Sequence, residues 1–183
     1  MINYEISWNQ FWMKRKMKTE LAGYISDGEN MIVLIPPAPP PPPLYKNTGT
    51  FNNKGIELTW EYQPLEVLRL HANYSFIAMK TPLPATPEHS LYFSGHYMYK
   101  KFHFNLKLQN IFNLYNQDNT GEVSIVERGY NLLGAGIGYR INKYLNVFIN
   151  AENLLNQEYQ INNGYPMPGI TIFGGVNLKY EKD

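Results

Sequence analysis

The sequence predicts an all-β protein, an antiparallel transmembrane β-barrel of which this chain holds about nine strands. Three observations carry the prediction. Apolar and polar residues alternate at period two in nine segments, the connections alternate between short and long, and Trp and Tyr gather at one end of alternate segments. Alternation at period two indicates strands because successive side chains of a strand point to opposite faces.

In each predicted strand the apolar residues occupy every second position, all odd or all even, which we call one parity. In residues 56–62, the apolar Ile56, Leu58 and Trp60 alternate with polar or acidic residues, and no Lys, Arg, Asp or Glu falls on the apolar parity of any segment. Strands that are apolar on one side and polar on the other are typical of a wall between lipid and a wet lumen. The predicted strands are residues 4–12, 17–25, 56–62, 68–76, 91–99, 102–108, 133–141, 145–151 and 170–180.

The connections give the predicted barrel a direction. Short ones lie at 13–16, 63–66, 100–101 and 142–144, and long ones at about 26–50, 79–88, 114–129 and 156–168. In outer-membrane barrels the periplasmic turns are short and the external loops are long. We therefore expect a periplasmic C-terminus and an external position for the proline-rich stretch 36–43. That stretch is expected to be a stiff polyproline spacer, with a ligand or partner contact as the alternative.

Aromatic residues mark the ends of the strands that run towards the short turns. Because Trp and Tyr favour the boundary between lipid and water, we expect an interfacial girdle at this rim. A soluble sandwich would not gather them at one rim. The predicted girdle consists of Trp12, Trp60, Tyr62, Tyr97, Tyr99, Tyr139 and Tyr180.

Composition excludes several other classes. Charged residues are 17% of the chain, against about 25% in an average soluble domain, and the formal net charge is +1. No field of one sign points to nucleic acid, and the absence of cysteine excludes disulfides and thiolate metal sites. The mean hydropathy of −0.39 is uninformative for a strand that shows lipid only every second residue.

The strand count and the N-terminus suggest a partial barrel. Single-chain bacterial barrels have an even number of strands, whereas nine are predicted, and no secretory signal begins the sequence. We expect residues 1–183 to form one partial barrel domain, the C-terminal part of a larger barrel. A truncated gene and a split reading frame are both open explanations.

Two stretches carry a family resemblance. Asn47 and Gly49, a polar spacer and then Gly-Ile-Glu-Leu at 55–58 are similar to the opening of a strand in the C-terminal barrel of TonB-dependent receptors. Ala-Glu-Asn-Leu-Leu-Asn-Gln-Glu-Tyr at 151–159 is similar to a phrase that ends a later strand of that family. The resemblance runs from about Asn3 to Tyr180 and corresponds to the last nine or so of the family's 22 strands.

The resemblance implies active uptake across the bacterial outer membrane. In the family, a plugged barrel binds a scarce ligand outside, and the periplasmic TonB complex pulls on the plug. The implied partners are outer-membrane lipid, TonB acting through a plug domain, and a small-molecule or metal-chelate ligand. The plug domain and TonB box would precede this sequence, so we expect that the chain alone does not transport. Tyr180 is followed by Glu181, Lys182 and Asp183 rather than ending the chain, which departs from the family's usual final aromatic residue.

Polar side chains on the inward parity are the candidate site. We expect every strand histidine to face inward, and a metal or haem site is conceivable, although an ordinary plug-facing wall is the simpler interpretation. No metal-ligand or cofactor motif supports more, so we expect neither a metal nor a cofactor. The lumen-facing candidates are His71, His96, His103, Arg69, Arg140, Glu57 and Glu152.

The function predicted is TonB-dependent uptake of a ferric siderophore, haem, cobalamin or glycan. No Ser/His/Asp constellation or phosphate-binding loop is present, so we do not expect an enzyme. A small independent barrel, acting as a passive pore or anchor, is the alternative. A soluble lipid-binding barrel is a third possibility, and it predicts a monomer without detergent.

Overall fold

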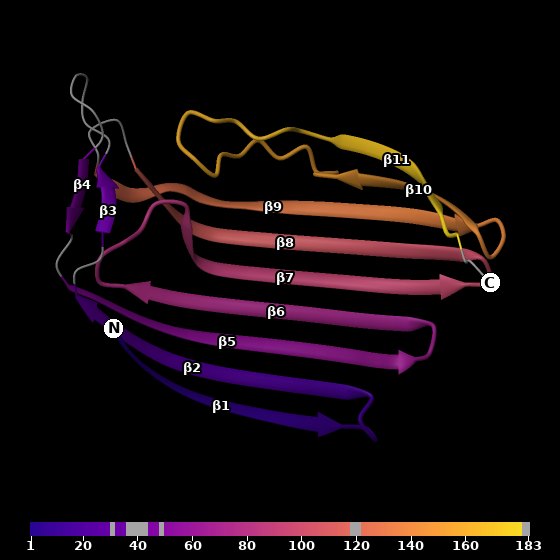
Figure 1. The fold of residues 1–183 in the computed structure, drawn as a ribbon, viewed down its shortest axis with the longest axis horizontal. Helices are drawn as coiled ribbons and strands as arrows, with labels where there is room; N and C mark the ends of the chain where they lie inside the picture. Colours follow the sequence, from indigo (N-terminus) through magenta and orange to yellow (C-terminus); the bar gives the residue numbers. More distant parts are fainter. Residues whose placement is uncertain (30–31, 36–43, 48–49, 118–121, 181–183) are drawn as a thin grey trace.

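The protein is a single open antiparallel sheet with a small hairpin at one end (Figure 1). The computed structural model describes residues 1–29, 32–35, 44–47, 50–117 and 122–180. In these residues, nine strands form one sheet in the order β1-β2-β5-β6-β7-β8-β9-β10-β11, and β3 pairs only with β4. The strands are β1 (Ile2–Trp12), β2 (Met17–Glu29), β3 (Ile32–Ile35), β4 (Leu44–Asn47), β5 (Thr50–Leu65), β6 (Leu68–Met79), β7 (Thr86–Tyr99), β8 (Phe102–Gln117), β9 (Val123–Arg140), β10 (Leu145–Glu152) and β11 (Thr171–Leu178).

The predicted fold class and all nine predicted strands are confirmed. The sheet follows the chain order, and its two ends differ as the connections predict (Figure 1). Tight turns join β1 to β2, β5 to β6, β7 to β8 and β9 to β10 at the turn end, and the remaining connections lie at the loop end. The described residues contain no helix long and apolar enough to cross a membrane.

The register divides the sheet into two chemically distinct faces. One row across it consists of Trp60, Ala72, Phe93, Leu108 and Leu133, which lie directly opposite one another on successive strands. We call this side of the sheet the apolar face. The residues that alternate with these point to the other side of the sheet, which we call the polar face. One row on that side consists of Lys18, Glu61, His71, Ser94 and Lys107. Period-two alternation in the sequence therefore corresponds to one apolar and one polar surface.

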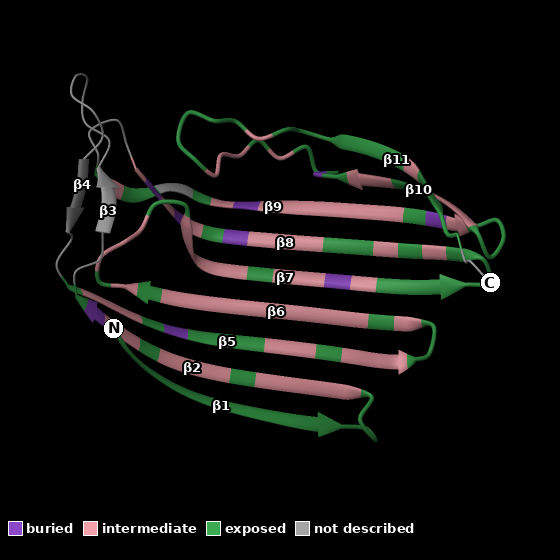
Figure 2. Cartoon of the chain, viewed as in Figure 1, coloured by how far each residue is buried: buried purple, intermediate pink, exposed green. Residues whose placement is uncertain are grey.

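The sheet has almost no protein core. Of the described hydrophobic residues only Ile111, Leu114 and Tyr130 are buried, whereas Ile6, Ile149 and Val176 on the apolar face are at least 58% exposed. Most of the sheet is intermediate or exposed (Figure 2). An exposed apolar surface this large is typical of a face that contacts a membrane or another protein.

The structure corrects the predicted lengths of several loops. Residues 114–129 were expected to form a long loop, but β8 continues to Gln117 and β9 begins at Val123. The strands extend here because their backbone pairing continues past a register shift between Leu114 and Tyr115. The 26–50 connection contains β2 residues up to Glu29 and the β3–β4 hairpin, and its proline-rich stretch 36–43 lies outside the described residues.

Candidate functional site on the polar face of the sheet

The polar face holds all seven side chains that were predicted to face inward. Glu57 and Arg69 lie on β5 and β6, His71 lies two residues from Arg69, and His96 is directly opposite Arg69 on β7. His103 is opposite Met98 of β7, which is two residues nearer the turn end than His96. Arg140 and Glu152 lie at opposite ends of the β9–β10 pair. The structure thus brings the candidates to one surface without joining them into one cluster.

A cavity of about 420 Å³ collects the basic part of this face near the turn end. Arg69, His71 and His96 line it together with a single carboxylate, Glu61. Basic residues from the β1–β2 turn also line it: Arg15, whose guanidinium lies 4.6 Å from the ring centre of Phe11, and Lys16. His103 does not line this cavity. The surroundings are therefore cationic, which suits a ligand or partner with carboxylate groups.

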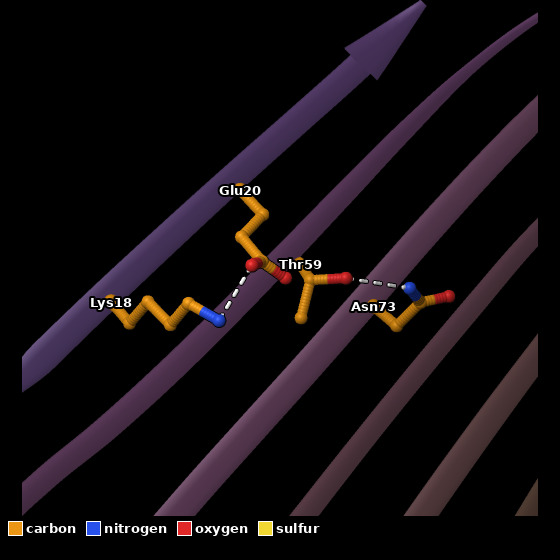
Figure 3. A network of polar contacts seen from close by, with 4 residues as sticks. All are labelled: Lys18, Glu20, Thr59 and Asn73. Atoms are coloured by element: carbon orange, nitrogen blue, oxygen red, sulfur yellow. Dashed lines mark hydrogen bonds and ion pairs between the residues drawn. The ribbon is translucent and has the colours of Figure 1, made fainter. Parts of the chain in front are cut away.

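Polar contacts within and between strands order the adjacent row (Figure 3). On β2, Lys18 Nζ lies 2.5 Å from Glu20 Oε1, and between β6 and β5 Asn73 Nδ2 donates to Thr59 Oγ1 at 3.1 Å. Glu20, Thr59 and Asn73 are register partners on β2, β5 and β6. Direct cross-strand neighbours on one face are close enough to interact, as Thr59 and Asn73 do here.

A second cavity of about 430 Å³ lies where the β10–β11 connection meets the polar face. Lys107 and Gln109 of β8 line one side, and Glu152 lies at the end of β10. Tyr92 of β7 and Tyr159 of the connection add aromatic surface. Both charges and apolar ring surface are available here, as in a typical small-molecule pocket.

The connection that borders this cavity is fastened by one asparagine. Asn153 has a φ of 50° and is 6% exposed. Its Nδ2 donates to Gln157 O at 2.9 Å and to Pro168 O at 3.0 Å, while its Oδ1 accepts from Gln157 N at 2.9 Å. Asparagine tolerates a positive φ better than most residues and carries both donor and acceptor. This explains the first Asn of the phrase at 151–159.

Tyr159, the last residue of the same phrase, packs the connection onto β9. Its ring centre lies 4.4 Å from that of Tyr130, beside the small buried cluster of Ile111 and Leu114. Burial, and secondarily the carboxylate of Glu152, raises the pKa of the Tyr159 hydroxyl. The sequence indicated this phrase only as a family resemblance; its role in anchoring the connection was missed because the contacts bridge distant residues.

The glycine of the other quoted motif also has a structural reason. Gly55 on the polar face lies directly opposite Tyr24 of β2, and a Cβ on Gly55 would be 2.3 Å from the Tyr24 ring. The ring therefore covers the glycine and fills the place of its missing side chain. No residue larger than glycine fits under the ring in this conformation.

One histidine contradicts the prediction that every strand histidine faces inward. His89 has the parity of Leu91 and lies on the apolar face, directly opposite Phe76 and Phe112. Its ring stacks on Phe76 with a centroid distance of 4.8 Å, and its Nδ1 is 2.8 Å from the Tyr74 hydroxyl. β7 begins at Thr86, so His89 is inside a strand whose predicted start was residue 91. Among the described residues, no three His, Asp or Glu side chains could together hold a metal ion.

The six predicted girdle residues that lie in strands have the parity of the apolar face and lie towards the turn end. Trp60 and Tyr62 have ring centres 5.6 Å apart, and Tyr139 is 4.8 Å from Phe102, an aromatic neighbour that the prediction omitted. Trp12 contacts Trp8 at 6.3 Å. Tyr97 and Tyr99 are at the end of β7, and Tyr180 lies two residues beyond β11.

Comparisons with known proteins agree with this fold. A family model described as TonB dependent receptor-like, beta-barrel, matches residues 1–154. No curated protein sequence matches the chain.

Solved structures share the fold at low sequence identity. The ferric-catecholate import receptor Fiu from E. coli K12 superposes with a TM-score of 0.74 at 19% identity over 96% of this chain and 27% of Fiu. The siderophore receptor PiuA from Acinetobacter baumannii gives 0.75 at 16% identity over 97% of this chain and 28% of PiuA. The copper transporter OprC gives 0.76 at 16% identity over 97% of this chain and 31% of OprC.

The chain therefore spans less than a third of each of these proteins. The shared fold, the two-faced sheet and a family model that covers 154 of the 183 residues lead to one conclusion. This chain belongs to the family of TonB-dependent receptor-like β-barrels.

Proposed function

We propose that this chain forms part of the barrel wall of an outer-membrane receptor for TonB-dependent uptake. The family match over residues 1–154 is the observation that carries the proposal. In this proposal the apolar face contacts outer-membrane lipid, and the polar face lines the lumen. The turn end lies at the periplasmic side, so β11 ends there and the connections at the loop end lie outside.

The height of the apolar face supports a membrane position. On β7 it runs eleven residues from Tyr99 to His89, and on β1 eleven residues from Trp12 to Ile2. At about 3.3 Å per step and a tilt of roughly 40°, the ten steps between the end residues span about 25 Å, the height of the apolar band of such barrels. Within this band Asn110 and Asn131 hydrogen bond to each other, so their polar groups are paired where lipid offers no partner.

The polar face supports a barrel whose lumen is occupied. The basic cavity around Arg69 and His96 suits contacts with carboxylates of a plug domain, and the cavity beside Tyr159 lies nearer the outer side. The ligand classes that fit the family are ferric siderophores, haem, cobalamin and glycans. The role is transport rather than catalysis.

Uptake by a strain that lacks the coding sequence tests the proposal. Labelled ferric siderophores, haem and cobalamin are supplied to the parent and deletion strains at limiting concentrations. We expect the parent alone to accumulate one of them, and a protonophore to abolish accumulation while leaving surface binding intact. Uptake that rises linearly with concentration and ignores the protonophore would instead identify a passive pore.

A pair of arginine variants tests the assignment of the two faces. Leu58→Arg puts a charge on the apolar face, and Ser75→Arg puts the same charge on the polar face, opposite Glu57. We expect Leu58→Arg to lower the free energy of unfolding in bilayers by about 2–4 kcal/mol, the cost of arginine near the bilayer midplane. Ser75→Arg should change it by less than about 0.5 kcal/mol. Equal losses in urea titrations would reject the lipid-facing assignment.

A further inference from the structure

Three basic side chains interrupt the apolar face at its loop end. Lys54 of β5 lies opposite Ala78, with the parity of Ile56 and Leu58. Lys80 follows β6 on the same parity, and its backbone N–H donates to Asn52 O at 3.0 Å. His89 of β7 is the third. They therefore occupy the same end of three adjacent strands, which are spaced at about 4.8 Å.

None of these side chains forms a salt bridge with a carboxylate of the described residues. The salt bridge found in them joins Lys18 and Glu20, on the opposite face. The nearest carboxylates on the same face are Asp27 and Glu29 of β2, the strand that pairs with β5, and Asp27 lies opposite Asn52 rather than Lys54. Asp27 Oδ1 also accepts a hydrogen bond from Asn52 Nδ2. The surface over β5, β6 and β7 thus keeps an excess of positive charge.

Two contacts hold the His89 ring at the edge of the apolar face. Its Nδ1 lies 2.8 Å from the Tyr74 hydroxyl. Stacking on Phe76 fixes the plane of the ring. An imidazole and two ammonium groups next to an apolar surface form a combination that suits an amphiphilic anion.

We propose that Lys54, Lys80 and His89 bind a phosphate group of a lipid in the outer leaflet. The inference rests on the proposed function, because it requires the loop end to lie at the outer side of the membrane. The apolar face below His89 contacts the acyl chains, while the ammonium groups of Lys54 and Lys80 lie at the level of the headgroups. Lysine acts as a flexible point charge towards phosphate, so the two side chains can close on one group from adjacent strands.

Binding of phosphorylated and dephosphorylated lipid tests this site. The full chain is folded in nonionic detergent micelles and titrated with fluorescent lipid A that carries two phosphates, or with the same lipid after dephosphorylation. We expect the phosphorylated lipid to bind at least tenfold more tightly, and this preference to shrink as salt is raised. Lys54→Gln and Lys80→Gln should each weaken binding about fivefold, the effect of one basic residue near an anionic lipid surface.

Two matched variants separate this site from general charge effects. Lys107→Gln removes a lysine from the polar face, and Lys100→Gln removes one from a turn at the other end of the sheet. Both should leave the affinity within twofold of that of the unaltered chain. Losses equal to those of Lys54→Gln would overturn the proposal.

The unaltered chain also decides the question without any variant. Equal affinity for the two lipids rejects the phosphate site, and this comparison is unaffected if a variant fails to fold. A chain that stays monomeric in water without detergent would instead refute the proposed membrane function. A chain that requires micelles but does not distinguish the lipids refutes only this inference.

Discussion

Replacing Asn153 tests how the β10–β11 connection is held on the polar face. The Asn153 side chain makes three hydrogen bonds, to the backbone of Gln157 and Pro168. At roughly 0.5–1.5 kcal/mol each, their loss costs about 3 kcal/mol of local stability. Asn153→Ala adds about 1 kcal/mol more, since alanine is strained at the φ of 50°. Asn153→Gly removes the hydrogen bonds without that strain.

Hydrogen exchange in detergent micelles measures this loss directly. We expect protection of amides in residues 153–170 to fall by about 100-fold in Asn153→Gly, and further in Asn153→Ala. Asn163→Ala is the control, because Asn163 is exposed and makes one hydrogen bond of 3.4 Å, to Gln117 O. A fall below tenfold in Asn153→Gly, or an equal fall in the control, would refute the anchoring role of Asn153.

Two further predictions concern aromatic rings on the polar face. Gly55→Ala should cost about 1–3 kcal/mol in urea unfolding because the new methyl group displaces the Tyr24 ring, whereas Gly23→Ala, whose Cβ meets only a backbone oxygen at 3.9 Å, should be nearly neutral. The raised pKa of Tyr159 stabilises the fold at pH values below the ordinary tyrosine pKa, and this contribution is lost as pH rises through the raised pKa. Exchange protection of the connection should therefore fall at alkaline pH in the unaltered chain but not in Tyr159→Phe; the same pH dependence in both would contradict this.

The central parts of the strands were predictable because each strand there separates two different environments. Leu106 on the apolar face and Lys107 on the polar face show the alternation plainly. Towards the loop end the signal disappears, since Asn116, Gln117 and Ser124 are polar whatever their parity. Asn116 is 5% exposed and donates to Ile161 O of the β10–β11 connection, so a polar residue is buried there by a distant segment. Without a period-two pattern, the ends of β8 and β9 were not predictable.

The candidate site was predictable as a surface but not as a set of contacts. Parity alone brings Arg69 and His96 to one face, and pairing of β6 with β7 then sets them opposite each other. His89 was misassigned because the predicted strand began two residues after it. The contact of Asn153 with Pro168 spans fifteen residues and depends on a positive φ, which the sequence does not reveal.

Because the sheet has almost no protein core, its two faces differ in how their side chains are packed at the loop end. Each face of this sheet has its own environment, lipid in the proposal for the apolar face and the lumen for the polar face. On the polar face, rings such as Tyr24 over Gly55, and Tyr159 against Tyr130, supply packing that a core would otherwise give. On the apolar face the change from Leu91 to His89 ends the apolar band within two residues. The effect of a substitution on stability should therefore depend on depth in the membrane for the apolar face, and on charge and shape for the polar face. This difference between the faces separates a membrane wall from a soluble sandwich.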